Sequence, residues 1–182
     1  EIYNGVGRNG KSKWVELMSY VLGDYKGTVP ITLVTQARTS IGSTSSEIVN
    51  LRGKRLAVMQ EPSKNMRINE GILKELTGGD ILQGRALYEN AVEFMPQFNL
   101  VVCTNTMPEI ESNDDGTWRR IRKCDFESKF VNDIHNPKWK DHRHIFKADR
   151  KINENFNKWK EIFASLLVRK AFETKGKVTA CD

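Results

Sequence analysis

Apolar and polar positions follow one another along the chain in patterns that predict strands and helices in turn. Residues 1–4 have the pattern of a strand that runs into a glycine-rich turn. A helix is predicted after the turn, because apolar residues recur at helical spacing and Gly23 closes the pattern. Those apolar residues are Trp14, Leu17, Met18, Val21 and Leu22.

Further strands are predicted where short apolar or β-branched runs end at polar residues. Three of these runs are expected to be buried strands of a parallel sheet. A fourth run, at 28–35, is rich in β-branched residues and predicts a strand as well. The three buried runs are 55–59, 99–104 and 121–126.

Two more helices follow from the same periodicity. One covers 68–76 and ends at Gly78-Gly79, and the other covers 149–172. The long helix carries an apolar stripe that is expected to pack on the core. The stripe consists of Ile152, Phe156, Trp159, Phe163, Leu166 and Leu167.

The remaining segments predict loops and one hairpin. Segment 84–94 contains two short runs on either side of Glu89-Asn90, which is a weak local signal for a hairpin. Residues 36–46 are rich in Ser, Thr and Gly, and 132–144 are polar and contain proline, so both are predicted to be loops. Strands that alternate with helices predict an α/β fold with a parallel sheet.

Composition adds that the chain fits one globular domain. It has 182 residues, of which 38% are hydrophobic and 29% charged. No apolar run approaches the roughly 18 residues of a membrane span, so no membrane partner is expected. The chain begins at Glu1 and enters a strand pattern almost at once, so we expect it to be part of a longer polypeptide.

Charge and cysteine content restrict the possible partners. The formal net charge of +6 permits a nucleic-acid partner, and a solvated basic face is the alternative. Cys103, Cys124 and Cys181 have no CxxC spacing, which favours a reducing compartment without disulfide or zinc sites. Cys103 and Cys124 lie in strand-like runs, where a free cysteine behaves as a small hydrophobe. The histidines lack further ligands nearby, so no metal site is expected at His135, His142 and His144.

Residues 5–12 match the phosphate-binding pattern G-x-x-x-x-G-K-[ST] between a predicted strand and a predicted helix. Glycines let such a loop curl so that its N–H groups converge on phosphate oxygens, and the helix dipole favours the same anion. Lys11 is predicted to reach the β- and γ-phosphates of ATP, and the Ser12 hydroxyl to ligate Mg²⁺. The alternative is a chance glycine loop, which both flanks disfavour. The predicted ligands are ATP and Mg²⁺, bound by Gly5, Val6, Gly7, Arg8, Asn9, Gly10, Lys11 and Ser12.

Two polar residues after buried strands are candidates for the hydrolysis step. Glu61 follows the strand predicted at 55–59 and is placed to orient the attacking water and to help bind Mg²⁺. Asn105 follows 99–104 and is a candidate sensor of the γ-phosphate. The alternatives are a solvated carboxylate and an asparagine that simply ends a strand.

In this order the motifs resemble those of the superfamily 3 helicases, in particular the ATPase domain of the poxvirus-type primase-helicases of large DNA viruses. The resemblance covers nearly the whole chain, and KFV at 129–131 and the Trp-bearing terminal helix are similar as well. The main motifs are GVGRNGKS at 5–12, LRGKRLAVMQEP at 51–62, LKELTGGDILQGRALYENAVEFMP at 73–96, LVVCTNTMPEI at 100–110 and DDGTWRRIRKCDF at 114–126.

The resemblance implies a P-loop core of the AAA+ kind, with a parallel sheet flanked by helices, a pre-sensor β-hairpin and a C-terminal helix. We expect 1–131 to form the ATPase core, with its start missing, and 132–182 to be a polar linker and C-terminal helical segment of the same domain. The resemblance also implies a ring, usually a hexamer, with ATP between subunits and hairpins that track single-stranded DNA. A primase or collar module is expected upstream, in the cytoplasm of an infected cell or in a viral factory.

The resemblance also assigns roles to single residues. Glu61 takes the place of the catalytic carboxylate and Asn105 that of the sensor. The family's arginine finger falls on Arg119 or Arg120, for which a solvated or salt-bridged pair is the alternative. Many relatives have an acidic pair at this motif, whereas here Gln60 precedes a single acid, so metal binding is expected to depend more on Ser12 and the nucleotide.

A second departure lies at the hairpin. Glu89-Asn90 stand near the tip, where some relatives have a basic residue. Better candidates for DNA contact are Lys64 and Arg85 for phosphate, and Tyr88 for stacking on a base. Each of the three is alternatively an ordinary surface or packing residue.

The leading functional hypothesis is therefore an ATP-dependent DNA helicase or translocase core of a viral replication enzyme. One alternative is a P-loop ATPase that remodels protein or packages DNA without unwinding. Another is a nucleotide-gated interaction module with weak turnover, for which the Gln60 departure leaves room. Stimulation of turnover by single-stranded DNA separates these hypotheses.

Overall fold

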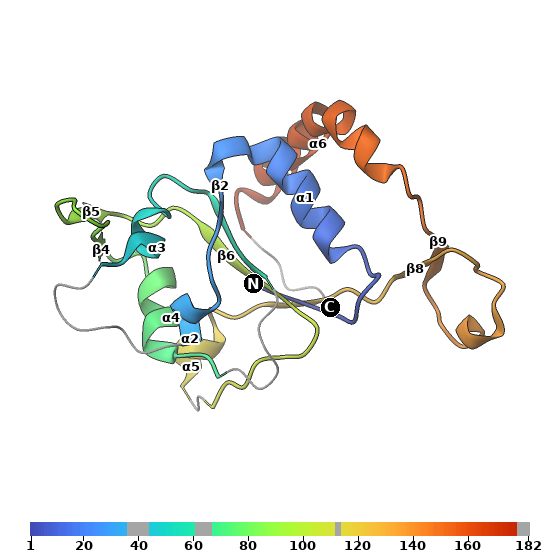
Figure 1. Cartoon of the computed structure of the whole chain (residues 1–182), viewed down its shortest axis with the longest axis horizontal. Helices are drawn as coiled ribbons and strands as arrows, with labels where there is room; N and C mark the ends of the chain where they lie inside the picture. The colour runs from blue at the N-terminus through green and yellow to red at the C-terminus, as the bar shows by residue number, and fades with distance from the viewer. Residues whose placement is uncertain (36–43, 61–66, 112–113, 178–182) are drawn as a thin grey trace.

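The computed structural model describes residues 1–35, 44–60, 67–111 and 114–177, and it has an α/β fold (Figure 1). A five-stranded sheet with the order β2-β3-β6-β1-β7 forms its centre, and all neighbouring strands are parallel. Parallel strands need crossover connections, which are mostly helical here. The strands are β1 (Ile2–Asn4), β2 (Lys26–Thr28), β3 (Leu56–Gln60), β6 (Asn99–Thr104) and β7 (Lys123–Asp125).

The adjacent strands β3 and β6 hold most of the buried apolar side chains of the sheet. They pair in register, with Val58 opposite Val101. A sheet covered on both faces explains why these strands are almost continuously apolar. The buried strands predicted at 55–59 and 99–104 are confirmed.

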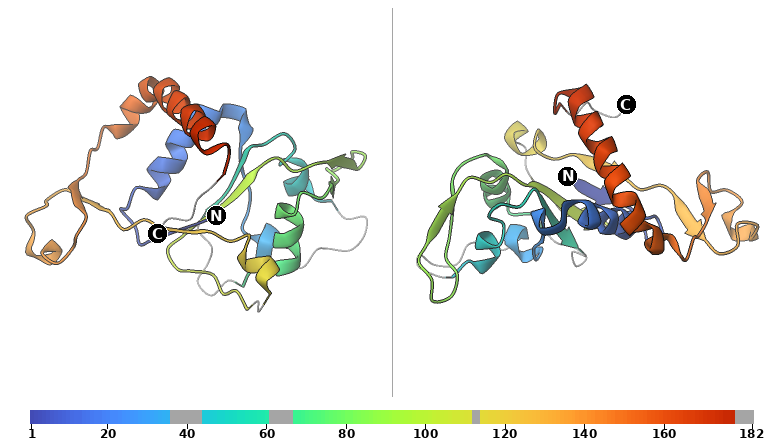
Figure 2. Two further views of the ribbon diagram at one scale, coloured as in Figure 1. Left: turned by 180° about the vertical axis from the view of Figure 1, so that it is seen from behind. Right: turned by 90° about the horizontal axis from the view of Figure 1, so that it is seen from above.

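Helices cover both faces of the sheet, and the sheet divides the core into two clusters. Because side chains alternate along a strand, Val58 lies in the cluster under α1 (Lys11–Leu22), whereas Met59 lies in the cluster with α4 (Glu70–Thr77). The terminal helix α6 (Ile152–Thr174) packs on α1, as Figure 2 shows. The predicted α/β architecture, a parallel sheet flanked by helices, is confirmed.

The local signals at the helix ends are confirmed as well. α1 ends at Leu22 with Gly23 as its C-cap, and Gly23 begins the short 3-10 helix η1 (Gly23–Tyr25). α4 begins two residues later than predicted, because Asn69 is its N-cap and accepts a hydrogen bond from Ile72 N at 3.2 Å. Gly78 ends α4.

The strand predicted at 28–35 is wrong beyond its first residue. β2 ends at Thr28, and the chain turns into the short helix α2 (Thr32–Thr35). Pro30 lies between them and has no backbone N–H, so it cannot extend the strand ladder. Val34 is fully buried in α2, so the apolar pattern of this segment reflects core packing rather than a strand.

β7 lies at an edge of the described sheet, beside β1. The strand predicted at 121–126 is confirmed, but its predicted burial is wrong, because Lys123, Cys124 and Asp125 are all exposed. Charged side chains are common on such edges, where they discourage pairing with another chain. Cys124 is therefore not a buried hydrophobe, whereas Cys103 is buried in β6.

The predicted hairpin is confirmed and projects from one end of the molecule (Figure 1). It consists of β4 (Leu82–Gly84) and β5 (Val92–Phe94), which pair antiparallel. Its base packs on α3 (Ser46–Val49), and a Cβ added at Gly84 would lie 2.9 Å from a side-chain carbon of that helix. Most of the loop predicted at 36–46 lies outside the described residues.

A second small sheet occurs where a polar linker is predicted. β8 (Lys129–Val131) and β9 (Ile145–Lys147) pair in parallel, and the 3-10 helix η2 (Pro137–Trp139) lies between them in the chain. Residues 129–147, called the arm below, extend to the right in Figure 1. Each strand of the arm has only three residues, so the alternation of apolar and polar positions is too short to predict either strand from the sequence.

The predicted terminal helix is confirmed as α6, but its apolar stripe is only partly buried. Phe156 is 1% exposed, and its ring lies 5.8 Å from that of Tyr20 on α1. Trp159 and Leu166 are 40% and 45% exposed, so the core packing predicted for the whole stripe is wrong there. In the part of the chain that the structure describes, no helix is long and apolar enough to span a membrane.

We expect Phe156→Ala to destabilise the protein by about 3–5 kcal/mol, because it leaves a cavity between α6 and α1. Phe172→Ala on the same helix is the matched control, since Phe172 is 84% exposed and its loss should change stability by less than about 0.5 kcal/mol. Urea unfolding followed by circular dichroism measures both. Equal effects of the two substitutions would contradict the packing of α6 on α1.

Candidate functional site

Residues 5–12, called the glycine loop below, connect β1 to α1. Gly5 and Gly10 have φ angles of 146° and 89°, which favour glycine. A Cβ at Gly5 would lie 2.5 Å from Asn9 Nδ2 and 2.8 Å from the Phe126 carbonyl oxygen. The tight curl predicted from the glycines is therefore present, and it leaves the backbone accessible to a ligand.

The N-terminal end of α1 meets the same loop. Gly10 is its N-cap residue, in the left-handed conformation, and provides no side-chain cap. The positive end of the helix dipole therefore points toward the loop, and the first N–H group of the helix, Lys11 N, donates to Asn9 Oδ1 of the same loop at 3.3 Å. Val6, Gly7 and Ser12 are exposed around this end, which suits the binding of an anion.

Lys11 is the buried charge of the site, with 7% of its surface exposed. Its Nζ donates a hydrogen bond to the Gly5 carbonyl oxygen. It also lies 3.3 Å from Asn105 Oδ1 and 3.5 Å from Asn9 Oδ1, and all three acceptors are neutral. Burial lowers the pKa of the Lys11 ammonium, and the positive charge of Lys129 lowers it further. A bound anion would supply a counter-charge that these acceptors do not.

The structure brings Asn105 to Lys11, although the two are 94 residues apart in sequence. β1 and β6 pair in parallel with Asn4 opposite Thr104, so the glycine loop and Asn105 start from the same edge of the sheet. Gly5 N donates to the Thr104 carbonyl oxygen at 3.2 Å and fixes the start of the loop. Ligands of open α/β sheets bind at this edge, where the carboxyl ends of the strands meet.

Two predicted site residues lie outside the described part of the chain. They are Glu61, predicted to orient water and help bind Mg²⁺, and Lys64, predicted to contact DNA. β3 ends at Gln60, opposite Cys103 of β6, so the carboxyl end of a third strand lies at this edge. Ser12 is exposed in the first turn of α1, which suits a Mg²⁺ ion held mainly by phosphate oxygens and water. Among the described residues, no cluster of three or more His, Cys, Asp or Glu could hold a metal by itself.

The predicted arginine pair lies at the end of α5 (Asp115–Trp118). Arg120 Nη1 donates to a backbone carbonyl of the same helix, and Arg119 is exposed. An ion pair between Lys74 of α4 and Asp114 ties α5 to α4. Figure 1 shows α5 beside α4, away from α1, so the structure does not bring the pair to the glycine loop of the same chain.

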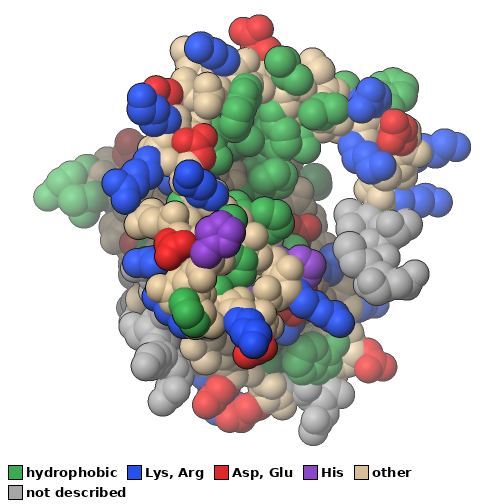
Figure 3. All heavy atoms as spheres, turned by 90° about the vertical axis from the view of Figure 1, so that its right-hand side faces the viewer, with side chains coloured by type: hydrophobic (Ala, Val, Ile, Leu, Met, Phe, Trp, Pro, Cys, Tyr) green, Lys and Arg blue, Asp and Glu red, His purple; other side chains and the backbone are tan. Residues whose placement is uncertain are grey.

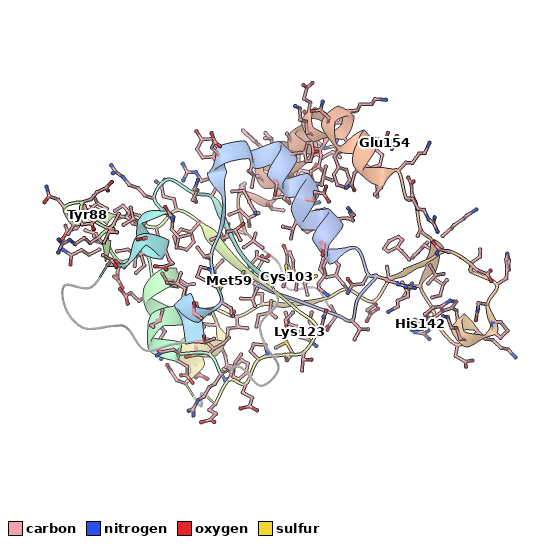
Figure 4. All side chains as sticks on the ribbon, viewed as in Figure 1. Met59, Tyr88, Cys103, Lys123, His142 and Glu154 are labelled. Carbon is pink, nitrogen blue, oxygen red and sulfur yellow. The ribbon has the colours of Figure 1, made fainter. Side chains whose placement is uncertain are left out.

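Arg85 and Tyr88 lie in the turn of the β4–β5 hairpin. Tyr88 is 93% exposed, and Figure 4 shows it at the opposite end of the molecule from the arm. Arg85 Nε donates to the Glu89 carbonyl oxygen at 3.0 Å, and its backbone exchanges hydrogen bonds with Ser45. These two residues therefore form a surface of their own, separate from the Lys11 site.

The arm contacts the glycine loop, which the sequence analysis missed. Phe130 N donates to the Arg8 carbonyl oxygen at 2.8 Å, and Lys129 Nζ donates to the Gly7 carbonyl oxygen at 2.7 Å. The Phe130 ring lies against Gly10, where an added Cβ would be 3.2 Å away. The KFV motif at 129–131 is the part of the sequence that makes this contact. Its three residues are too few to show a periodicity, so the sequence could not predict that the motif lies beside the loop.

An open cavity of about 580 Å³ lies between the glycine loop, the end of β7 and the arm. Figure 3 faces this side of the molecule and shows histidine side chains among those of lysine and arginine. At the rim, Asp125 forms an ion pair with Lys123 at 2.8 Å and accepts from Asn4 Nδ2 at 2.7 Å, and these contacts lower the pKa of its carboxyl. The cavity is lined by residues 4–6, 125–129 and 141–144.

Proteins of large DNA viruses are similar to this chain over most of its length. "Putative helicase L207/L206" of Acanthamoeba polyphaga mimivirus is 39% identical over 175 residues, which cover 92% of this chain and 18% of the relative. "Putative helicase 022R" of Frog virus 3 (isolate Goorha) is 34% identical, with 86% of this chain and 16% of the relative covered. "Putative primase C962R" of African swine fever virus (strain Badajoz 1971 Vero-adapted) is 31% identical, with 75% and 14% covered. The chain thus spans less than a fifth of each relative.

Solved structures share the fold. The A form apo structure of the NrS-1 C-terminal region matches with a TM-score of 0.61 and 17% identity, over 90% of this chain and 34% of that one. The apo structure of the NrS-1 C-terminal region (305–718) gives a TM-score of 0.59 at 16% identity, over 90% and 35%. At such identities the likeness supports the fold alone.

A family model described as "Family of unknown function (DUF5906)" matches residues 3–120, which is more than half of the chain. The match includes the glycine loop, β3, β6, the hairpin and the arginine pair. The predicted resemblance to helicase and primase proteins of large DNA viruses is confirmed by the named relatives. The chain belongs to the DUF5906 family.

Proposed function

We propose that this chain is the ATPase core of a viral primase-helicase, which hydrolyses ATP to move along single-stranded DNA. The observation that carries the proposal is the buried Lys11 ammonium, whose hydrogen-bond partners are neutral, at the carboxyl edge of a parallel sheet. A buried charge with neutral partners is unfavourable in an empty site and becomes favourable once a polyphosphate is bound. The names of the viral relatives, two helicases and a primase, support the same conclusion.

In the proposed reaction the glycine loop holds the phosphates. Lys11 Nζ exchanges its bond to the Gly5 carbonyl for a phosphate oxygen, and the N–H groups of the first turn of α1 bind further oxygens. Ser12 contributes one ligand to Mg²⁺, which neutralises phosphate charge. Asn105 is near enough to Lys11 to contact the γ-phosphate, and Glu61 is the proposed group that orients water.

The proposed DNA contact is the β4–β5 hairpin. Its tip presents the exposed Tyr88 ring for stacking and Arg85 for a phosphate, and Lys64 is proposed to add a second charge. The net charge of +6 fits such a partner. Nucleotide and DNA would then bind at separate places, so movement of the hairpin would have to follow from changes at the glycine loop.

The proposed assembly is a ring, with six subunits as the expected number. Arg119 and Arg120 lie away from the glycine loop of their own chain, so one of them would act on the nucleotide of a neighbouring subunit. A primase or collar module is proposed in the same polypeptide, because the viral relatives are more than five times as long as their matched part. The proposed location is the cytoplasm of an infected cell.

Lys11→Met should abolish ATP binding without lowering the stability of the ligand-free protein. In the wild type, Mg-ATP at 100 times its Kd should add about 2.7 kcal/mol to the free energy of unfolding, and in the variant it should add nothing. The pKa of Lys11 is lower in the folded protein than the ordinary value of 10.5 that it has in the unfolded chain, so the folded state loses this proton at lower pH. Any stability advantage of the variant should therefore shrink as the pH rises toward that value.

Thermal unfolding with and without Mg-ATP measures this effect. Lys13→Met is the matched control, because the Lys13 side chain is 46% exposed on the same helix and should leave ATP stabilisation intact. Stabilisation by ATP that survives in the Lys11 variant would contradict the proposed phosphate site.

Replacement of the hairpin residues should weaken binding of single-stranded DNA in two different ways. Arg85→Ala should reduce the slope of log Kd against log salt by about 0.7, because one phosphate contact is lost. Tyr88→Ala should leave the slope unchanged and weaken binding by about 1–3 kcal/mol, the value of one stacked base. Fluorescence anisotropy with labelled oligonucleotides at several salt concentrations measures both.

Arg169→Ala is the charge-matched control, since the Arg169 side chain is 70% exposed on α6 and far from the hairpin in sequence. It should change neither the slope nor the affinity. If all three substitutions behaved alike, the hairpin would not be the DNA contact.

Two inactive variants should restore activity when they are mixed. Lys11→Ala disables the glycine loop but keeps the arginine pair, whereas the double variant Arg119→Ala, Arg120→Ala does the reverse. Mixed assemblies contain interfaces with one intact loop and one intact arginine pair, so part of the ATPase rate should return. The rate of the wild type should also rise more steeply than linearly with protein concentration. A dilute monomer at full specific rate, without gain from mixing, would exclude the shared site.

A further inference from the structure

The cavity beside the glycine loop lies on the side where the rest of a bound nucleotide must emerge. β1 lies between β6 and β7 in the sheet. Lys11 Nζ is bonded to Asn105 at the end of β6, whereas the cavity opens at the end of β7. A lysine in this loop pattern reaches the β- and γ-phosphates. The terminal phosphate therefore points toward Asn105, and the remainder of the molecule leaves toward β7.

The two walls of the cavity are held at a fixed separation. One wall is the segment that follows β7, and the other is the arm. Lys129 begins the arm where the segment after β7 ends, and its backbone N–H donates to the His144 carbonyl oxygen at 2.8 Å, so the two walls are tied together at this junction. Phe130 N donates to the Arg8 carbonyl oxygen at 2.8 Å, which joins them to the glycine loop. The cavity is therefore built into the same unit as the phosphate site.

The arm wall offers planar groups on which a base can stack. His142 and Arg143 both line the cavity, and imidazole and guanidinium planes stack on bases. The position of His142 is set by the arm, because its ring lies edge-on to that of Trp139 at 6.0 Å and its backbone N–H donates to the Trp139 carbonyl oxygen at 3.0 Å. Figure 4 labels His142 within the arm.

The cavity also contains acceptors for hydroxyl groups. The carboxylates of Glu127 and Asp141 line it and are exposed, and Glu127 lies 3.9 Å from His144 Nε2. Carboxylates are common acceptors for ribose hydroxyls. A nucleic-acid backbone would be repelled by these charges, so the mixture of planar and acidic groups favours a nucleoside.

We infer that this cavity binds the base and ribose of the nucleotide whose phosphates occupy the glycine loop. The base stacks on His142 and Arg143, and the ribose hydroxyls donate to Glu127 or Asp141. The volume of about 580 Å³ lies within the usual range of small-ligand pockets. The inference rests on the proposed function, because it takes the phosphates to lie in the glycine loop. It makes the arm a part of the nucleotide site.

Competition between ATP and inorganic tripolyphosphate separates this subsite from the phosphate site. Both ligands displace a fluorescent ATP analogue from the whole chain, and their Kd values are compared among variants. The double variant His142→Ala, Arg143→Ala should raise the Kd of ATP about tenfold and leave that of tripolyphosphate within about twofold, because one stacked base is lost. Glu127→Gln should raise the Kd of ATP and not that of tripolyphosphate.

Lys140→Ala is the matched control, because it removes a positive charge from an exposed position of the arm that does not line the cavity. It should change neither Kd, and thermal unfolding should show all variants folded. Equal weakening of both ligands by the arm double variant, or no effect on either, would overturn the inference. Lys11→Ala tests the proposed function separately, because it should raise the Kd of both ATP and tripolyphosphate. Unchanged binding of both would overturn the phosphate site, and the arm variants would still test the cavity.

Discussion

The buried ammonium of Lys11 is the constraint on which the rest of the site depends. It lies where β1 and β6 end, and its partners are a backbone carbonyl and two side-chain amides. Several features of the fold follow from this arrangement. Gly5 must lack a side chain because a Cβ there would clash with Asn9 and the Phe126 carbonyl oxygen, and the parallel pairing of β1 with β6 brings Asn105 within hydrogen-bond distance of Lys11. In the function proposed above, a charge held in this way would be prepared for a polyphosphate before one arrives.

The arm extends the same site in the other direction. Its contacts with the glycine loop run through the backbone of Arg8 and Gly7 and through the Phe130 ring on Gly10. Displacement of the arm would therefore disturb the glycine loop as well as the cavity. The hairpin and α5 lie elsewhere on the molecule. In the proposed function, a signal from the nucleotide would therefore have to reach them through the sheet and α4, or across a subunit boundary.

Local chemistry explains what could be predicted. The glycine loop was identified because only glycine allows its curl and because a strand and a helix flank it. β3 and β6 were found because strands covered on both faces are continuously apolar, and α1 was found because its apolar side chains recur on one face. The hairpin was found from a weaker signal, because Glu89-Asn90 separates two short runs. The exposure of Arg85 and Tyr88 follows from their position in the turn of this hairpin.

The sequence by itself therefore determined the parallel α/β core, the glycine loop and the positions of most helices, because each has a signal within a few residues. Only the tertiary structure decided which strand became the exposed edge and how much of α6 was buried. It also decided that Lys11 meets Asn105 and that Phe130 covers Gly10. These contacts join residues about a hundred positions apart, and they depend on strand order and packing, which local periodicity does not encode.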